Sequence, residues 1–210
     1  MNKNKKEGKI FMERLRLEKP TLKREQDGIE YVNEHLSTGS ILRGSGQLLN
    51  YVQYGNYNGW LNKLKAEKNI KPSETEVPSV TYFLVREDDN AIVGMLNVRL
   101  ALNESLKKLG GNIGCGIRPN EQGKGYDKLS LYLALKVCDK YGLENVVIDC
   151  DKENIDYRTD IQNLGAKLIG EHFNDSVNCM IEDYEIDVKK TLNEKKNEYE
   201  PLIAPSHLSY

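Results

Sequence analysis

A glycine-containing turn past the middle of the chain has residues that could bind an anion. Gly123 and Gly125 flank Lys124 in a short polar segment, which follows the apolar residues 113–117 and precedes a helical pattern. The first amides of a helix have no partner within the helix, and the helix dipole favours negative charge there. Glycines leave the N–H groups of such a turn uncovered. The segment is therefore predicted to bind a phosphate-like group.

Two common phosphate-binding patterns do not fit this turn. A P-loop requires a glycine five residues before Gly123, where this chain has Arg118, and it requires Ser or Thr after Lys124, where the chain has Gly125. A dinucleotide fingerprint requires a third glycine at the position of Lys128, and it normally opens the first strand–helix–strand unit of a chain. Both patterns are excluded.

The composition describes a soluble globular protein. The chain has 210 residues, 30% of them charged, and a formal net charge of −2, so it has no general attraction to nucleic acid or to an anionic membrane. No apolar run approaches the roughly 18 residues needed to span a bilayer. The four cysteines lack a Cys-x-x-Cys spacing and the three histidines are far apart, which predicts no metal site and reduced thiols in the cytoplasm.

Hydrophobic periodicity predicts a mixed α/β domain centred on one sheet. Residues 1–12 are an N-terminal extension, 13–188 form the domain, and 189–210 form a charged, largely solvated tail. The expected strands are 14–18, 80–87, 91–102, 113–117, 146–148, 166–172 and 178–188, and the expected helical segments are 21–36, 48–68 with an interruption at its glycines, 103–110, 126–141 and 154–164.

The glycine turn resembles a motif of the GNAT (Gcn5-related N-acetyltransferase) superfamily. Gln122-Gly123-Lys124-Gly125-Tyr126-Asp127 is similar to the Gln/Arg-x-x-Gly-x-Gly/Ala motif of that superfamily. Residues 77–85, 92–95, 110–114, 150–154 and 184–187 look like one bacterial branch of it, so the resemblance extends from about Leu15 to Val188.

The resemblance implies a twisted mixed sheet with helices on both faces, splayed open between its fourth and fifth strands. Acetyl-CoA would lie in the splay, with its pantetheine paired to the backbone of Ile117 and Arg118 and with Asn154 nearby. Its pyrophosphate would bind the N–H groups of Gln122, Gly123, Lys124, Gly125, Tyr126, Asp127 and Lys128. Asp127 stands where the superfamily has Gly or Ala, and a solvated carboxylate there would cost about 1 kcal/mol, which Lys124 and Lys128 could offset.

Acetyl transfer to an amine requires a base for the amine, donors for the oxyanion and an acid for the departing thiolate. Many relatives use as the acid a tyrosine at the position that is Ile161 here. Tyr157, one turn earlier on the same helix, and Tyr184, on the last strand, are the candidates for the acid, although each could equally be a packing residue. The candidates for a base acting through water are Asp149, Asp151 and Glu104.

The resemblance thus predicts an acyltransferase that moves an acetyl group from acetyl-CoA directly to a primary amine, most simply of a small molecule. It predicts no metal cofactor, no nucleic-acid or membrane partner, and a monomer or homodimer. Two alternatives are open: a non-catalytic acyl-CoA-binding domain, which Asp127 and Ile161 would favour, and an acetyltransferase that modifies proteins.

Overall fold

A computed structural model describes residues 13–205, so the predicted extension 1–12 and the last five residues lie outside the described part of the chain. The strands are β1 (Leu15–Glu18), β2 (Ser79–Arg86), β3 (Ile92–Arg99), β4 (Ile113–Ile117), β5 (Asn145–Asp151), β6 (Lys167–Asn174) and β7 (Cys179–Asp187). The helices are α1 (Glu25–Thr38), α2 (Leu48–Val52), α3 (Tyr57–Glu67), α4 (Glu104–Lys108), α5 (Tyr126–Lys140), α6 (Ile155–Asn163) and α7 (Val188–Tyr199), with 3₁₀ turns at Leu22–Arg24, Pro119–Glu121 and Glu200–Leu202.

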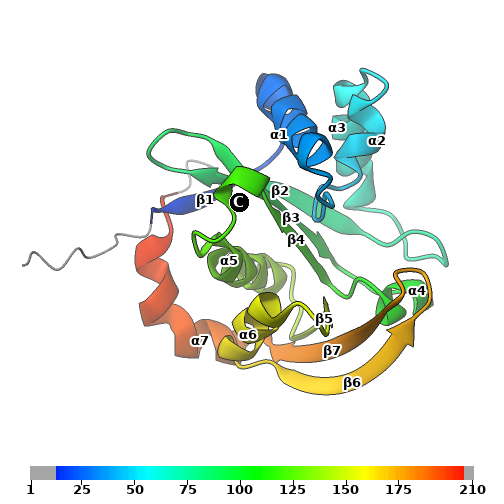
Figure 1. Ribbon diagram of the computed structural model, residues 1–210, viewed down its shortest axis with the longest axis vertical. Coiled ribbons are helices and arrows are strands. Elements are labelled where there is room, and N and C mark those ends of the chain that lie inside the picture. The colour runs from blue at the N-terminus through cyan, green and yellow to red at the C-terminus, as the bar shows by residue number, and fades with distance from the viewer. Residues whose placement is uncertain (1–12, 206–210) are drawn as a thin grey trace, which may run out of the picture.

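The strands form two antiparallel sheets rather than the one sheet that periodicity predicts (Figure 1). One sheet has the order β1-β2-β3-β4, and the other has the order β5-β7-β6. The chain therefore has the mixed α/β architecture that the resemblance implies, with its break between the fourth and fifth strands. Hydrophobic periodicity could not predict the position of this break. β4 pairs only with β3 and β5 only with β7, and the sequence of a strand does not show whether one or both of its edges are paired.

Helices cover both faces of the four-stranded sheet, and alternation along its strands explains why (Figure 1). Tyr82 and Leu84 of β2 face the core that contains α5, whereas Phe83 and Val85 face the core that contains α1 and α3. Successive side chains of a strand point to opposite faces, so a strand that is apolar throughout must be covered on both. Helix α5 is buried on nearly every side, since ten of its residues are inaccessible to solvent.

The end of the described chain is helical and packs against the domain, although most residues of the predicted tail that the structure describes, 189–205, are exposed as expected. The ring of Tyr199, at the end of α7, stacks on that of Tyr132 of α5 with centroids 4.8 Å apart. Lys136 forms an ion pair of 2.6 Å with Glu200, and the amide of Ala204 donates to the carbonyl of Leu15. A few apolar side chains on one helix face suffice for docking, although the segment as a whole is strongly charged.

Residues 13–205 contain neither a membrane-spanning helix nor a cluster of metal-binding side chains. The helices in this range are all too short or too polar to cross a bilayer. Within the same range, no three His, Cys, Asp or Glu side chains gather in a way that could hold a metal ion.

Candidate active site

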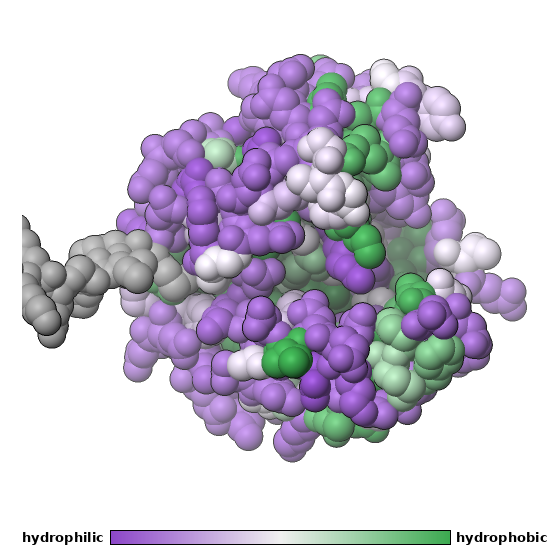
Figure 2. All heavy atoms as spheres, in the orientation of Figure 1, coloured by the Kyte–Doolittle hydropathy of each residue, from purple (hydrophilic) through white to green (hydrophobic). Residues whose placement is uncertain are grey.

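The two sheets are joined at one end and part at the other. Next to the start of β4, the amide of Asn112 donates to the carbonyl of Val147 on β5 over 2.7 Å, and the amide of Val147 donates to Oδ1 of Asn112 over 2.9 Å. Beyond these contacts no ladder joins β4 to β5 in the described chain. Figure 2 shows the surface hollowed between the part of the molecule that carries α1–α3 and the part that carries α6, β6 and β7.

Backbone geometry holds the two strands together at this closed end. Gly111 has a φ of +50°, and a Cβ on it would lie 2.4 Å from the carbonyl oxygen of Val147. Only glycine tolerates both the positive φ and the close approach. Asn112 adds a third tie, because its Nδ2 donates to the carbonyl of Arg99 on β3. These contacts hold β4 and β5 together at one end, so the gap that opens between them beyond it, the splay, is a fixed feature of the fold.

The glycine turn leaves the start of α5 uncovered, as the sequence predicts. Gly123 and Gly125 have φ values of +76° and +81°, and no atom lies within 4 Å of the place that a Cβ on Gly123 would take. Gly125 is the N-cap of α5, and no side chain caps the helix there. The first-turn amides thus remain available to an anion at the end of the helix where the dipole favours one.

Asp127 lies in the first turn of α5 with a half-buried side chain. Burial raises the pKa of its carboxyl, and the nearby carboxylates of Asp160 and Asp156 raise that pKa further. The two lysines that could offset its charge already have partners: Lys128 lies 3.5 Å from Asp160, and Lys124 lies 2.7 Å from Glu121. The negative charge at the turn is therefore only partly compensated.

The predicted pantetheine-binding residues are partly engaged within the chain. The amide of Arg118 donates to Val93 and its carbonyl accepts from Glu121, while Gln122 Nε2 approaches the carbonyl of Ile117 at 3.4 Å. The guanidinium of Arg118 points away from the splay, because it forms an ion pair of 2.5 Å with Glu34 of α1. Any contact of Arg118 with a ligand in the splay would have to use the second lone pair of its carbonyl.

Tyr157 lies between the two sheets. Its neighbours include Cys115 of β4 and Cys150 and Asp149 of β5, and its burial raises the pKa of its phenol well above the usual range. The side chain of Asn154 fixes the backbone of Tyr157 at the start of α6, because Asn154 Oδ1 accepts from the Tyr157 amide as the N-cap. The phenol is therefore protonated at neutral pH, and its place between the strands makes Tyr157 a candidate for the proton donor on position.

Tyr184 is a packing residue by its contacts. Its hydroxyl donates to Glu182 over 2.6 Å and accepts from Gln162 over 3.1 Å, and only 1% of its surface is exposed. The side chain is packed in the main core. With both hydroxyl functions used and with solvent excluded, Tyr184 is a much poorer candidate for the acid than Tyr157.

The candidates for the base separate clearly. Asp149 has no hydrogen-bonded partner for its carboxylate among the described residues, and it lies close enough to Tyr157 and to Arg99 of β3 to affect the titration of both. Asp151 accepts from the amide of Glu153 in a local turn. Glu104 is almost fully exposed on α4 and pairs with Lys107. Of the three, Asp149 alone faces the splay with a free carboxylate.

Cys115, although it lies on β4, is a poor nucleophile. Burial is the main cause that raises the pKa of its thiol, to about 12, so that almost no thiolate is present at neutral pH. This agrees with a direct transfer rather than a covalent enzyme intermediate.

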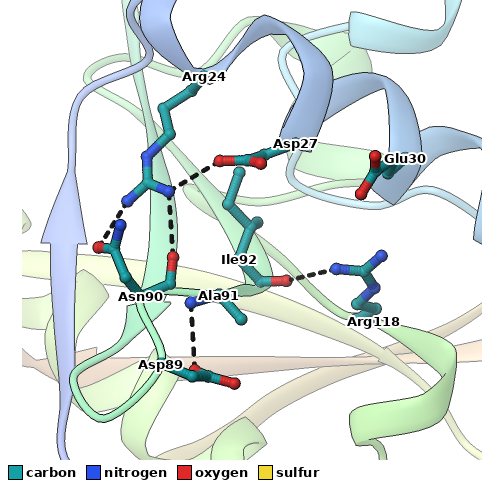
Figure 3. A pocket seen from close by; sticks show the side chains of 8 residues that line it. All are labelled: Arg24, Asp27, Glu30, Asp89, Asn90, Ala91, Ile92 and Arg118. Carbon is teal, nitrogen blue, oxygen red and sulfur yellow. Dashed lines mark hydrogen bonds and ion pairs between the residues drawn. The ribbon is translucent and has the colours of Figure 1, made fainter.

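A separate polar cavity of about 320 Å³ lies at the start of α1 and the β2–β3 turn (Figure 3). Its charged side chains largely satisfy one another. Arg24 donates to Asp27, Glu18 and Asn90, and Asp89 pairs with Arg86. Because its cations are already bound by acids of the chain, this cavity is a structural network rather than a rival to the splay.

Comparison with known proteins identifies the family of the chain. The model of the "Acetyltransferase (GNAT) domain" family matches residues 45–167, which is more than half of the chain. A search of curated proteins finds no match. Among solved structures, the chain is similar to a GNAT-family acetyltransferase from Bacillus anthracis (16% identity, 85% of this chain and 97% of the other covered, TM-score 0.55). It is also similar to a mutant form of the spermidine/spermine N-acetyltransferase from Vibrio cholerae (15% identity, 87% and 98% covered, TM-score 0.57). A third similar structure is the microcin C7 self-immunity acetyltransferase in complex with acetyl-CoA and AMP (16% identity, 81% and 91% covered, TM-score 0.55).

Proposed function

The chain belongs to the GNAT acetyltransferase domain family and is an acyltransferase; from that premise we propose that it moves an acetyl group from acetyl-CoA directly to a primary amine of a small molecule. The observation that carries the proposal is the position of Tyr157. Its phenol lies in the splay between β4 and β5, on the same side of the fold as the uncapped start of α5. One neighbour in fold, the microcin C7 self-immunity acetyltransferase, is a complex with acetyl-CoA, which supports the choice of donor.

The donor would bind along β4 with its pyrophosphate on the α5 turn. The amides of residues 122–128 would donate to the phosphate oxygens, and the αL conformation of Gly123 and Gly125 keeps the turn open for them. The pantetheine would run past Ile117 toward Tyr157, as an added strand beside β4. Asn154 fixes the start of α6 next to this path.

In the transfer step, the amine nitrogen attacks the thioester carbonyl and a proton leaves the nitrogen for a base. Asp149, the free carboxylate at the splay, would take that proton directly or through a water molecule. Collapse of the tetrahedral intermediate breaks the carbon–sulfur bond, and Tyr157 would give its phenolic proton to the departing thiolate. The phenol is protonated in the resting protein, since burial raises its pKa, and the proton would leave it only as negative charge develops on the sulfur.

Acetyl-CoA binding by calorimetry and thiol release with a panel of amines test this function. Tyr157→Phe should lower kcat by about a hundredfold or more while the Kd for acetyl-CoA changes little, because a general acid typically contributes about 10²–10⁴-fold to the rate. Tyr54→Phe is the matched control, since Tyr54 is 84% exposed on the surface. Equal activity of the two variants would remove Tyr157 from the mechanism, and absence of acetyl-CoA binding would remove the function itself.

The match to the acetyltransferase family disfavours the alternative that the sequence left open, a non-catalytic acyl-CoA-binding domain. Binding of acetyl-CoA without release of thiol in the presence of any amine would support this alternative.

We further propose a cytoplasmic protein, because all four cysteines are free and three of them lie in strands where reduced thiols pack well. A monomer or homodimer is proposed for its assembly, with sedimentation as the test.

A further inference from the structure

A histidine is buried at the end of α1 with one ring nitrogen unsatisfied. Only 2% of the surface of His35 is exposed, and its Nδ1 lies 2.8 Å from the hydroxyl oxygen of Ser40, just after the helix. Its Nε2 is fully buried and has no hydrogen-bond partner in the described part of the chain. An unpaired polar atom in the interior costs stability. Packing alone therefore does not account for an imidazole at this position.

The contacts of His35 connect α1 to the strand that borders the splay. Its ring packs against that of Tyr31, one turn earlier, with the ring centroids 4.7 Å apart. The hydroxyl of Tyr31 in turn donates to the carbonyl of Gly116 on β4 over 3.1 Å. Helix α1 lies on the face of the four-stranded sheet opposite α5 (Figure 1). His35 thus lies between this helix and the segment that follows it.

That segment, residues 39–46, lies directly on β4, and we call it the β4 cover. Gly44 has a φ of +67°, and a Cβ on it would lie 2.5 Å from the carbonyl oxygen of Gly114. A Cβ on Gly116 would lie 2.7 Å from the carbonyl oxygen of Arg43. Backbones this close leave no room for side chains, so the cover can rest on β4 only where glycines meet.

The β4 cover is held at both of its ends by a single aromatic side chain. At the start, Gly39 ends α1 in the left-handed conformation, and Ser40 is bound to His35 through both its amide and its hydroxyl. At the other end, Nε1 of Trp60 donates to the carbonyl of Gly46 over 2.9 Å. A change at either side chain should therefore loosen the cover from β4.

A positive charge on His35 is strongly disfavoured in this place. Burial is the main cause that lowers its pKa, and the guanidinium of Arg118 lowers that pKa further, whereas Glu34 on the same helix raises it. Glu34 compensates little, because its carboxylate is already paired with Arg118 and accepts from the amide of Asn120. A protonated ring would also bury an Nε2–H that has no acceptor. The charged imidazole is therefore more stable in water than in this site.

We propose that protonation of His35 opens the β4 cover: the ring leaves its site for water, and residues 39–46 separate from β4. A histidine whose pKa is lowered in the fold contributes stability above the ordinary value of 6.5, and this stability is lost as the pH falls through the folded pKa. The ratio of open to closed protein should rise by up to about tenfold for each pH unit over that interval. The last turn of a helix is also where local opening costs least.

The consequence for catalysis rests on the proposed function, in which acetyl-CoA lies along β4. Arg43 of the cover lies close enough to Cys179 of β7 to affect the titration of its thiol, so the cover also borders the splay. Opening would remove this border and expose the face of β4 that the cover protects. Acetyl transfer should therefore require the closed form, in which His35 is neutral.

The fluorescence of Trp60 tests the opening directly, because Trp60 is the only tryptophan of the chain and is fully buried. Between pH 8 and pH 5, its emission should move to longer wavelength with a midpoint below 6.5, as the bond to Gly46 is lost. Far-ultraviolet circular dichroism should stay constant over the same range. His35→Gln and His35→Phe should give no shift, and either variant suffices if the other does not fold.

His172→Gln is the matched control, because His172 lies on β6 in the other sheet, where it is ion-paired with Asp183. It should keep the wild-type titration. A constant emission of the wild type, or the same shift in the His35 variants, overturns the proposal. A shift that coincides with loss of the dichroism signal overturns it too, because the whole domain would then be unfolding.

The ratio of kcat/KM for His35→Gln to that for the wild type, with one amine acceptor, tests the consequence for transfer. The titration of the amine itself cancels in this ratio, which should be near one at pH 8 and should rise severalfold at pH 5.5. The fluorescence titration needs neither donor nor acceptor. Its failure would therefore leave the proposed function intact, and absence of acetyl transfer would leave the opening of the cover intact.

Discussion

Replacement of Asp127 by Asn should strengthen the binding of acetyl-CoA. Asp127 carries the negative charge closest to the amides that would receive the pyrophosphate, in the first turn of α5. The substitution removes the charge and keeps the shape of the side chain. It leaves the glycine turn unchanged, since Gly123 and Gly125 set the backbone there. Only the electrostatic term between the carboxylate and the ligand should therefore change.

The size of the effect follows from the burial and the partners of Asp127. Two unit charges about 6 Å apart interact by about 0.7 kcal/mol in water and by about 3 kcal/mol at an effective dielectric constant of about 20. The half-buried carboxylate lies between these limits, and its neighbouring lysines are held by Glu121 and Asp160. A gain of about 1 kcal/mol is expected, which lowers the Kd about fivefold.

Calorimetric titration with acetyl-CoA at low and moderate salt measures the effect. Asp156→Asn is the control, because Asp156 is an exposed carboxylate nearby in the first turn of α6. The difference between Asp127→Asn and the wild type should shrink as salt is added, since screening weakens charge–charge terms at the surface. If Asp127→Asn binds no more tightly than Asp156→Asn does, the carboxylate does not face the ligand and the reasoning fails.

The charge of Asp127 should also make stability and acetyl-CoA affinity depend on pH. The pKa of Asp127 is raised in the folded protein, so its contribution to stability is full below the ordinary value of 3.8 and is lost as the pH rises through the folded pKa. At neutral pH, Asp127→Asn should therefore be the more stable protein. The affinity of the wild type for acetyl-CoA should approach that of the variant as the pH falls and the carboxylate becomes protonated.

Three further outcomes are expected. Tyr157→Phe should lower kcat without weakening acetyl-CoA binding, as measured by thiol release and calorimetry. Asn112→Ala should lower the free energy of unfolding by about 1–3 kcal/mol in denaturant titration, because it leaves the half-buried amide of Val147 without its acceptor. Tyr199→Ala should lower that free energy by about 3 kcal/mol or more, because it removes the ring stacked on Tyr132, and an unchanged midpoint would mean that α7 does not stabilise the domain.

The elements around the glycine turn were predictable because their signals are local. The strand Ile113–Ile117 ends just before Pro119, and the helix begins directly after Gly125, in agreement with the sequence. Proline and glycine act on their own backbone torsion angles, so their effects do not depend on the rest of the fold. The uncapped start of α5 could be predicted for the same reason.

Features that depend on register could not be predicted in this way. Nothing in the local sequence around Asp149 tells that it faces Asp183, because the two lie 34 positions apart and meet only through the β5–β7 ladder. A slip of one residue would send each side chain to the opposite face. The docking of α7 could not be predicted from composition for a related reason. Composition averages over the whole segment, whereas packing depends on the few residues of one helix face. Val188 and Tyr199 are buried residues of α7.

The acid proposed here, Tyr157, would keep the family's chemistry although the family's usual residue is absent. Ile161 takes the place where relatives have tyrosine, and it is fully buried. Tyr157 is four positions earlier, so it lies on the same face of α6 and one turn nearer the start of the helix. That turn is the one held by the Asn154 cap, next to β4 and β5. A hydroxyl at position 157 could therefore reach the splay from the same helix face, whereas position 161, one turn further along, is packed in the core.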